Sequence, residues 1–307
     1  MLNVTRLRVL HEVARLGSLT AAAKELSYTI SAVSQQITLL ERETGSELLE
    51  RQPRGVRLTE AGRVLVAHAG TVLSELRAAA EAVQAVNLGH GGRLRFGSFP
   101  TANAALMPRA VAEFRERHPE VELVLTELDR DEGLTTIGAR ELDIVLVYEF
   151  PVVPIVVPDN IEVHRLLVDP LHIMLPSDHP LASRKRLRLT DLADQHWIQG
   201  VHHGSTMDVL PRACRAAGFE PDIVFRTDDQ MTVRGLVAAG LGIALAPWLA
   251  LSAVPAGIVA RPLREPTLTR TVLVALPAAA SVLPAASAMV DALRSAGAAL
   301  GDILPRR

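Results

Sequence analysis

Cysteine is almost absent from the sequence, which has Cys214 alone among its 307 residues. A single cysteine excludes an intramolecular disulfide and provides no metal-ligating cluster. We expect this residue to be a small buried hydrophobic side chain, and we expect no bound metal.

Long hydrophobic runs are also missing, although 49% of the residues are hydrophobic. The longest runs, such as 144–147 and 273–280, stop well short of the roughly 20 residues that a membrane-spanning helix needs. The amino-terminal segment carries Arg6, Arg8 and Glu12 within a helical pattern, without an apolar core and cleavage site, so we expect no signal peptide. These features predict a cytoplasmic protein that does not act at a membrane.

Sequence motifs of catalysis are missing as well. The chain has no glycine-rich phosphate loop, no nucleophile elbow and no pair of acidic residues at a catalytic spacing. We therefore do not expect an enzyme, and we expect no cofactor.

Charge of one sign is not concentrated strongly in any part of the chain. The net charge is −2, and residues 1–65 hold nine basic residues against seven acidic ones. A bias this mild supports nucleic-acid binding only weakly.

Three helical patterns follow one another in the first 45 residues. Apolar residues at spacings of three and four predict a first helix that Gly17 ends. A short helix over 21–26 follows, and Thr29 is suited to cap a third helix that runs to about residue 43, where Gly45 ends it.

The third predicted helix has two different faces. Its apolar face consists of Ile30, Val33, Ile37 and Leu40. Its opposite face carries short uncharged polar side chains, namely Ser31, Ser34, Gln35 and Thr38. Helical hairpins are common in protein cores, but such side chains also suit the major groove, because they hydrogen-bond to base edges without repelling phosphates.

The segment "ERQPRGVRLTEAG" predicts a hairpin with a basic tip, formed by Arg51, Arg54 and Arg57. Arginines placed in this way can contact phosphates or the minor groove, which gives affinity but little sequence information. The alternative interpretation is that each arginine is a solvated surface charge.

A long helix is predicted from Thr59 onward. Apolar residues at alternating steps of four and three form a coiled-coil seam, namely Leu65, Ala69, Val72, Leu76, Ala79, Val83 and Val86. So narrow a stripe implies a partner helix, most simply from a second copy of the chain. The segment 87–92 is expected to break this helix and serve as a hinge.

From Arg93 onward, strand and helix patterns alternate, which predicts a parallel sheet with right-handed crossovers. Among the helices we expect are 104–118, 131–140, 205–217 and 230–239. Two similar α/β lobes indicate a binder of small molecules, with the ligand beyond the carboxyl ends of the strands.

Two turns are the main candidates for the ligand site. "GSFPTAN" places Ser98, Phe99 and Thr101 at a predicted helix start, where hydroxyls and free amides favour anions, although simple capping is the alternative. "GVHHGSTMD" is the matching turn of the second lobe and contains Val201, His202, His203 and Ser205. Adjacent histidines point apart and no third ligand is evident, so we expect contact with an anion that depends on pH and no metal.

Further candidates follow other predicted strands, namely Asp129, Arg130, Thr227, Asp228 and Pro247. Arg130 could pair with a ligand carboxylate, or equally with Asp129 or Asp131. Ordinary loop chemistry is the alternative for all of them.

The run "GSLTAAAKELSYTISAVSQQITLLERETGSELLERQPRGVRLTEAG" resembles the winged helix-turn-helix of LysR-type transcriptional regulators, with "AVSQQI" and "VRLTEAG" in the expected order. The resemblance implies an α/β protein with an all-α, winged amino-terminal domain. Its expected parts are a winged helix-turn-helix over 1–58, a linker helix and hinge over 59–90, and a two-lobed effector domain over 91–307, similar to type 2 periplasmic binding proteins. The first lobe would comprise 91–164 and 266–303, and the second 165–265.

The resemblance also implies roles for residues. The polar face of the third helix would enter the groove, Thr29 would contact phosphate, and the three arginines would form the wing and its flanks. Ile30 departs from the family, in which proline or glutamine is frequent there. An apolar residue at this position could pack or touch a thymine methyl.

We therefore predict a sequence-specific DNA-binding transcriptional regulator that is controlled by a small, anionic effector between the lobes. The resemblance implies homodimers joined by the linker helices and homotetramers assembled through the effector domains. A solute-binding protein of a transporter is an alternative, but residues 1–86 and the missing signal peptide argue against it. An enzyme that uses the α/β cleft is the weaker alternative.

Overall fold

The computed structural model describes residues 2–52, 55–88, 92–201, 208–251, 256–264, 267–278 and 283–303. The predictions for Arg54, His202, His203 and Ser205 lie outside these residues. The chain divides into two compact units, Met1–Gly92 with Ala139–Glu141, and Arg93–Gly138 with Leu142–Arg307. Each unit is described by itself.

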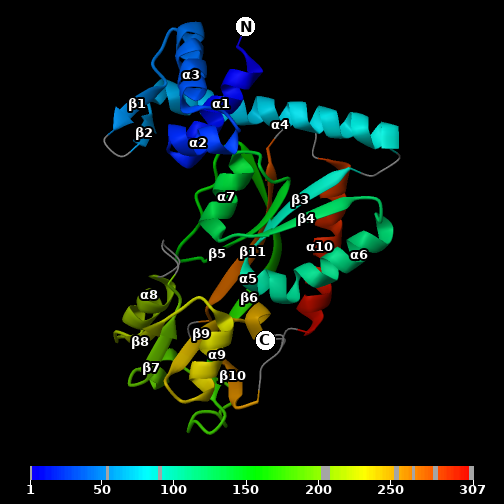
Figure 1. Ribbon diagram of the computed structural model, residues 1–307. Helices are drawn as coiled ribbons and strands as arrows, with labels where there is room; N and C mark the ends of the chain where they lie inside the picture. The colour runs from blue at the N-terminus through cyan, green and yellow to red at the C-terminus, as the bar shows by residue number, and fades with distance from the viewer. Residues whose placement is uncertain are drawn as a thin grey trace. The chain divides into compact units, whose positions relative to one another are not determined.

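Three short helices build the amino-terminal unit (Figure 1): α1 (Val4–Leu16), α2 (Leu19–Glu25) and α3 (Ile30–Thr44). Each begins where a side chain accepts hydrogen bonds from the first turn, at Asn3, Ser18 and Thr29. Gly17 and Gly45 follow α1 and α3 with φ of 62° and 68°, a conformation that glycine adopts at low cost. The predicted cap and end of the third helix are therefore confirmed.

A shared core holds these helices together. Its fully buried members include Leu10, Val13, Val33 and Leu40, and no polar group has to be buried among them. Full burial of a side chain of this size contributes about 1.5–3 kcal/mol, so the apolar face of α3 is fixed inward. The polar face of α3 is therefore directed outward.

A two-stranded hairpin and a long helix follow. Strands β1 (Leu49–Gln52) and β2 (Gly55–Leu58) pair antiparallel, as expected for the basic hairpin. Helix α4 runs over Glu60–Leu88, so the expectation that Asn87 already breaks the helix is wrong. Asparagine and leucine are both tolerated in a helix, whereas the glycines that follow disfavour it.

The expected seam of α4 is only partly covered within the chain. Ala69 is fully buried against the amino-terminal core, but Val72, Leu76 and Val83 leave 41%, 49% and 60% of their surfaces exposed. The side chain of Val86 lies outside the described set. An apolar stripe therefore remains uncovered along the carboxyl-terminal half of α4.

The second unit contains two βαβ arrangements. Strand β3 pairs parallel with β4 and β5 in the first, and β7 pairs parallel with β8 and β9 in the second. In the first, the strands are β3 (Arg93–Ser98), β4 (Glu122–Glu127) and β5 (Ile144–Glu149), and the helices are α5 (Pro100–Ala105), α6 (Met107–Arg117) and α7 (Arg130–Gly138). In the second, the strands are β7 (His196–Gln199), β8 (Asp222–Arg226) and β9 (Ile243–Pro247), and the helices are α8 (Val209–Ala216) and α9 (Gln230–Ala238).

The predicted parallel pairing is confirmed within each series, but the sheet as a whole is mixed. The long strand β6 (Ile161–Pro176) and strand β11 (Thr269–Pro277) pair antiparallel with each other, and β11 also runs antiparallel to β5. The strand order is β4-β3-β5-β11-β6-β9-β7-β8, with β10 (Ile258–Pro262) beside β6. The chain must pass from one lobe to the other and return, and these two strands make the two passages.

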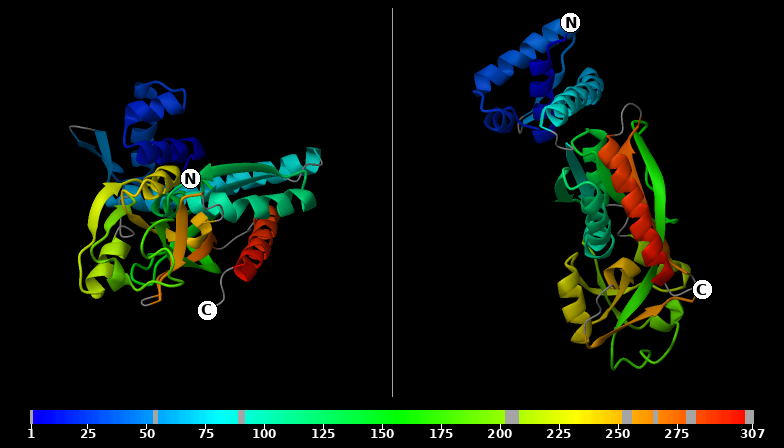
Figure 2. Two further views of the ribbon diagram at one scale, coloured as in Figure 1. Left: turned by 90° about the horizontal axis from the view of Figure 1, so that it is seen from below. Right: turned by 90° about the vertical axis from the view of Figure 1, so that its right-hand side faces the viewer.

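We call β3, β4, β5 and β11 with α5, α6, α7 and α10 (Pro284–Ile303) the first lobe, and β7 to β10 with α8 and α9 the second lobe. Helix α10 packs against α6 and β6, as both views of Figure 2 allow the reader to follow. Buried residues such as Phe96, Phe114 and Leu293 fill the first lobe, and Trp197 and Cys214 lie in the core of the second. The expected burial of Cys214 is confirmed.

The predicted start of the helix at 104–118 is wrong. Helical structure begins at Pro100 instead of residue 104, and the helix is interrupted at Leu106 before α6 starts. Pro108 explains the interruption, because it has no N–H to donate and its ring would clash with the carbonyl of Ala104 in a continuous helix. In the second lobe the described part of α8 begins at Val209, and the predicted start at residue 205 lies outside the described residues.

Short structured turns complete the second unit, namely the 3-10 helices η1 (Leu189–Leu192) and η3 (Trp248–Leu251). Among the residues that the structure describes, no helix is both long enough and apolar enough to span a membrane.

Gly62 is a position where the packing between the hairpin and α4 depends on a missing side chain. A Cβ at Gly62 would lie 2.2 Å from the backbone oxygen of Leu48. We expect Gly62→Ala to lower the free energy of unfolding of the amino-terminal unit by about 1–3 kcal/mol, as overpacking does. The matched control is Gly235→Ala in α9, where nothing lies within 4 Å of the new Cβ. It should raise stability by about 0.5–1 kcal/mol. Urea unfolding followed by circular dichroism measures both, and equal stabilities would contradict the packing described.

Candidate nucleic-acid interface and ligand cavity

The outer face of α3 presents a continuous row of polar side chains. Ser31, Gln35 and Thr38 are exposed and lie at spacings of four and three, so they share one side of the helix. Ser34 lies beside them and is half-buried. The structure therefore brings the predicted row together on one surface.

Three hydroxyls of this region, those of Thr29, Ser31 and Thr38, take part in local hydrogen bonds. The Thr29 hydroxyl accepts a hydrogen bond from the Ala32 amide at 3.1 Å and lies 3.0 Å from the Ser31 hydroxyl. The Thr38 hydroxyl donates to the Ser34 carbonyl at 3.1 Å. Thr29 is thus the cap of α3, and the Gln35 amide and the Ser31 hydroxyl are the most accessible groups for an external partner.

Arg42 continues this face and was missed by the sequence reasoning. It lies four residues beyond Thr38, is exposed, and forms no ion pair with any described residue. The signal was present in the sequence, because the alternating steps of four and three that join Ser31, Gln35 and Thr38 continue with a step of four to Arg42. A cation here adds attraction for a polyanion at the end of the polar row.

The hairpin carries a charge pair that changes the interpretation of Arg57. Its guanidinium forms a 2.8 Å ion pair with Glu50, which is its direct neighbour across the hairpin. The charge of Arg57 is therefore matched before any partner binds. The side chains of Arg51 and Arg54 lie outside the described set.

A buried ion pair lies at the centre of the second unit. Arg270 on β11 and Asp169 on β6 are 4% and 1% exposed. The Arg270 Nε donates to Asp169 Oδ2 at 2.9 Å, and its Nη2 donates to the Thr101 hydroxyl at 2.6 Å. The rings of Phe99 and Tyr148 lie 5.0 and 4.8 Å from the guanidinium carbon. The guanidinium thereby joins strands β11, β6 and β5 to helix α5.

The second oxygen of Asp169 extends this cluster toward the second lobe. Asp169 Oδ1 accepts a hydrogen bond from the Leu249 amide at 3.2 Å, and Leu249 belongs to η3, directly after β9. Burial raises the pKa of the Tyr148 hydroxyl, which the positive charge of Arg270 opposes, so Tyr148 stays protonated. The cluster therefore consists of one ion pair, between Arg270 and Asp169, surrounded by the neutral side chains of Thr101, Phe99 and Tyr148.

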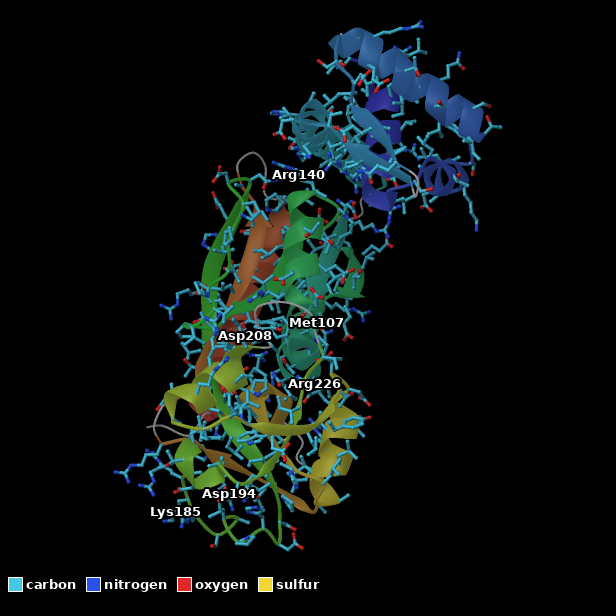
Figure 3. All side chains as sticks on the ribbon, turned by 90° about the vertical axis from the view of Figure 1, so that its left-hand side faces the viewer. Met107, Arg140, Lys185, Asp194, Asp208 and Arg226 are labelled. Atoms are coloured by element: carbon cyan, nitrogen blue, oxygen red, sulfur yellow. The ribbon has the colours of Figure 1, made fainter. Side chains whose placement is uncertain are left out.

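A cavity of about 140 Å³ lies next to this cluster. Residues of both lobes line it, namely Phe150, Leu171, Ile198, Gln199, Gly200, Val209, Leu210, Leu245, Pro247 and Arg270. Figure 3 labels Met107 of the first lobe and Asp208 of the second at the level where the lobes meet. Most of the wall is apolar. Arg270 supplies the charged group, and its Nη1 makes no hydrogen bond to the described residues.

Of the predicted ligand residues Ser98, Phe99 and Thr101 of the first lobe, the last two lie beside the ion pair, and none of the three lines the cavity. Phe99 and Thr101 contact Arg270 directly. Ser98 is 1% exposed, and its hydroxyl has no hydrogen-bond partner in the described part of the chain. Thr101 lies inside α5 and does not cap it, so its role is to receive the Arg270 guanidinium.

Asp129 and Arg130 have local structural roles. The carboxylate of Asp129 accepts from the Glu132 amide at 2.8 Å, which caps α7. Arg130 is buried and pairs with Asp131 at 2.8 Å. The alternative of pairing with Asp131 is therefore observed for Arg130.

The predicted residues of the second lobe support the cavity wall. Asp228 Oδ1 accepts from the Val201 amide at 3.0 Å and would lie 2.6 Å from a Cβ at Gly200. The Thr227 hydroxyl accepts from the Asp229 amide at 3.2 Å. Pro247 lines the cavity itself. Gly200 lets Asp228 approach closely and so shapes this side of the site.

The central pair Arg270 and Asp169 was missed by the sequence reasoning. Each is a lone charge in an apolar strand, "TRTVLVALP" and "LLVDPLHIML". Such charges are rarely buried unless they are paired, which is a usable signal, although it does not identify the partner. In the described part of the chain, no group of three histidine, cysteine or acidic residues is placed to hold a metal ion.

Comparison with known families decides the assignment. The family described as "Bacterial regulatory helix-turn-helix protein, lysR family" matches residues 4–63, and the LysR substrate binding domain matches residues 87–298. The chain belongs to the LysR family. It is a transcriptional regulator with a helix-turn-helix DNA-binding domain and an effector-binding domain.

Characterised relatives match over nearly the whole chain. The small neutral protease regulatory protein of Streptomyces coelicolor is 33% identical over 96% of this chain and 93% of its own length. The transcriptional dual regulator GltC of Bacillus subtilis is 28% identical over 93% of this chain and 94% of its own.

Solved structures share the fold. A full-length OxyR variant from Pseudomonas aeruginosa has a TM-score of 0.71 at 24% identity, covering 96% of this chain and 95% of the other. The LysR-family regulator CbnR, in a complex with its target DNA, has a TM-score of 0.62 at 21% identity, covering 96% of this chain and all of the other. The predicted mixed architecture of a helix-turn-helix domain and an α/β effector domain is confirmed.

The buried pair yields a stability prediction for this regulator. Asp169→Ala leaves the Arg270 charge buried without its partner, so we expect a loss of about 3–5 kcal/mol in the free energy of unfolding. The control is Asp208→Ala, which removes an ion pair with Arg212 in which both side chains are 51% exposed. This exposed pair should contribute less than about 1 kcal/mol. Denaturant unfolding of both variants checks the difference, and comparable losses would refute a central role for Asp169.

Proposed function

We propose that this LysR-family regulator reads promoter DNA with the outer face of α3, and that a small molecule in the cavity beside Arg270 controls its binding. The proposed working parts are a winged helix-turn-helix over 1–58, a linker helix and hinge over 59–90, and an effector domain over 91–307. The observation that carries the proposal is a cavity between two lobes whose one charged lining group, within the described residues, still has a donor to offer.

The DNA contacts follow from the exposed groups of α3. Gln35 can donate to and accept from an adenine edge, and the Ser31 hydroxyl can serve either base type. Thr38 and Ser34 flank them, and Thr29 at the helix start is placed to meet phosphate. Arg42, Arg51, Arg54 and Arg57 would add contacts to the phosphate backbone, which give affinity and register.

The chemistry of the cavity defines the class of effector. Its wall is mostly apolar, and its volume is below the roughly 300–1,000 Å³ of sites for drug-sized ligands. Arg270 is already paired with Asp169, so its Nη1 can meet one further group of the ligand, a carboxylate or another hydrogen-bond acceptor. A second ligand carboxylate would have no positive charge to pair with at this site. A small monocarboxylate with an apolar body matches these properties.

Control of DNA binding would work by population shift. A ligand that contacts both lobes favours the arrangement in which the lobes lie closest. The equilibrium between the open and closed arrangements then shifts by no more than the difference in the ligand's affinity for the two. The Arg270 cluster spans β6, β11 and η3, so a ligand at Nη1 acts on the segments that join the lobes.

Self-association is the second part of the proposal. The exposed seam of α4 at Val72, Leu76 and Val83 suits a homodimer formed through the linker helices, with homotetramers assembled through the effector domains. We place the protein in the cytoplasm, acting as a regulator and not as an enzyme.

We do not propose that this regulator senses oxidants through a thiol. Three of the similar structures are described as OxyR with a substituted cysteine, one of them with bound hydrogen peroxide. In the present chain Cys214 is fully buried, and burial raises the pKa of its thiol to about 12. The reactive thiolate is therefore scarce at neutral pH.

DNA binding can be tested by protection of the regions upstream of the protein's own gene and its neighbours. We expect a protected segment, and we expect Gln35→Ala to weaken binding to it by about tenfold or more, because one bidentate base contact is worth about 1–3 kcal/mol. Gln230→Ala, a change of the same residue type in α9, should leave the affinity unchanged. Absence of any protected segment would contradict the proposal.

The effector site can be tested by filling the cavity. Val209→Phe replaces a valine side chain on the cavity wall by a larger phenyl ring. Val224→Phe makes the same change on β8, where Val224 is 39% exposed. We expect a panel of small monocarboxylates to contain a compound that shifts the DNA affinity or melting temperature of the wild type and of Val224→Phe. The shift should be at least about tenfold smaller in Val209→Phe, because the ring excludes the ligand. An equal response in both variants would move the effector site elsewhere.

A further inference from the structure

The second lobe carries a short run of basic side chains that the proposed function does not use. Residues 183–190 contain no acidic residue and four basic ones, in a chain whose net charge is −2, namely Arg184, Lys185, Arg186 and Arg188. All four are exposed. Figure 3 shows Lys185 at the end of the second lobe, far from Met107 in the first, and no residue of the run lines the cavity. The run is therefore separate from the proposed effector site.

The core of the second lobe holds this run in place. Leu187 and Leu189 alternate with basic residues and are fully buried in that core. Because these leucines are directed inward, the intervening Arg186 and Arg188 are directed to solvent. The Leu187 carbonyl also accepts a hydrogen bond from the amide of Arg264 at 2.7 Å, which brings a further exposed arginine to the run. We call these five side chains the basic patch, namely Arg184, Lys185, Arg186, Arg188 and Arg264.

One carboxylate matches part of the charge of the basic patch. Asp191 Oδ2 accepts from Arg184 Nη1 at 3.1 Å, and Asp191 Oδ1 accepts from Arg188 Nη2 at 3.0 Å. The hydrogen bond from Arg188 is the main cause that lowers the pKa of Asp191, so this carboxylate is ionised at neutral pH. The side chains of the other three members form no ion pair with the described residues. Glu265, which follows Arg264, lies outside those residues. Within the described part of the chain, the patch therefore keeps an excess of positive charge.

The size and surroundings of the patch indicate the class of partner. Single exposed cations bind a small anion weakly, whereas several together attract a chain of anions. The segment 184–188 spans at most about 18 Å, and Asp194 is exposed at the same end of the lobe (Figure 3). A DNA duplex carries a charge every 1.7 Å or so along its axis and would extend past the patch to such acidic side chains. A short acidic peptide fits the patch alone, and Asp191 shows that its arginines accommodate a carboxylate between them.

We propose that the basic patch is an interaction surface for an acidic segment of another protein, whose carboxylates pair with the cations that Asp191 leaves unmatched. The surface is distinct from α3 and from the cavity beside Arg270, so the proposal goes beyond the proposed function. It adds a class of partner, a peptide segment with several glutamates or aspartates in succession.

A fluorophore beside the patch reports binding at that place and not elsewhere on the protein. Thr190 is exposed and Cys214 is fully buried, so Thr190→Cys gives the full-length protein a single accessible thiol for labelling. The probe is a decapeptide of glutamate at low salt, and a decapeptide of glutamine is the uncharged control. We expect a saturable change of fluorescence with the glutamate peptide alone. Salt of about 0.5 M should abolish the change, because charges are then screened beyond about 4 Å.

The labelled protein is then compared with two double variants. Lys185→Ala with Arg186→Ala removes two exposed cations of the patch, a surface change that should leave the fold intact. We expect it to bind the glutamate peptide about two- to twentyfold more weakly, since one exposed ion pair changes an affinity by a factor of about five at most. The matched control is Arg109→Ala with Arg165→Ala, which removes two exposed arginines of the same unit that lie outside the patch. It should bind the peptide as tightly as the protein without these substitutions.

Several outcomes would overturn the proposal. One is that the glutamate peptide causes no change of fluorescence, and another is that the two double variants bind it equally. If the label responds to duplex DNA but not to the peptide, the patch is a nucleic-acid surface and the proposed partner is wrong. In cells, the double variant of the patch should alter transcription of a reporter gene while its protection of the DNA stays the same. Unchanged transcription would show that no partner uses the patch.

Discussion

The ion pair between Arg270 and Asp169 is the constraint on which the second unit depends. A charge with 4% exposure is costly to bury, and here it is matched by one carboxylate, one hydroxyl and two aromatic rings. The partners come from β6, β11, β5 and α5, and Asp169 also holds the amide of Leu249. All of these segments must be in place before the pair is satisfied, so the pair ties the two passages between the lobes to the site beside them.

The same pair determines what the cavity can bind. A lone arginine in an apolar wall would attract anions strongly, but it would also be unstable there. With Asp169 in place the positive charge is largely matched, and in the proposed effector site the donor that remains would select for a single acceptor group on a small apolar body. Under the proposed function, structural and ligand-binding requirements meet in the Arg270 side chain, whereas Phe99 and Thr101 hold that side chain in place.

The amino-terminal unit meets a different requirement, because the surface that we propose to contact DNA must stay exposed. Burial of Val33 and Leu40 fixes the rotation of α3, which leaves Ser31, Gln35 and Thr38 outside. Local hydrogen bonds occupy Thr29 and Thr38 and use part of the capacity of the exposed Ser31 hydroxyl, and an ion pair with Glu50 occupies Arg57. The groups that remain accessible are a glutamine amide, a serine hydroxyl, Arg42 and the apolar surface of Ile30. Their combination makes the surface of this family member distinct from one built of charge alone.

The sequence by itself determined the features that depend on neighbouring residues: the cap at Thr29, the end of α3 at Gly45, the hairpin, the seam of α4 and the family. The break before α6 also lay within its reach, because Pro108 forbids a continuous helix by local geometry. Only the tertiary structure decided that β6 and β11 run antiparallel, and hence that Asp169 meets Arg270, 101 residues further along the chain. No local rule selects such a partner, because the contact exists only after the chain has passed into the second lobe and returned.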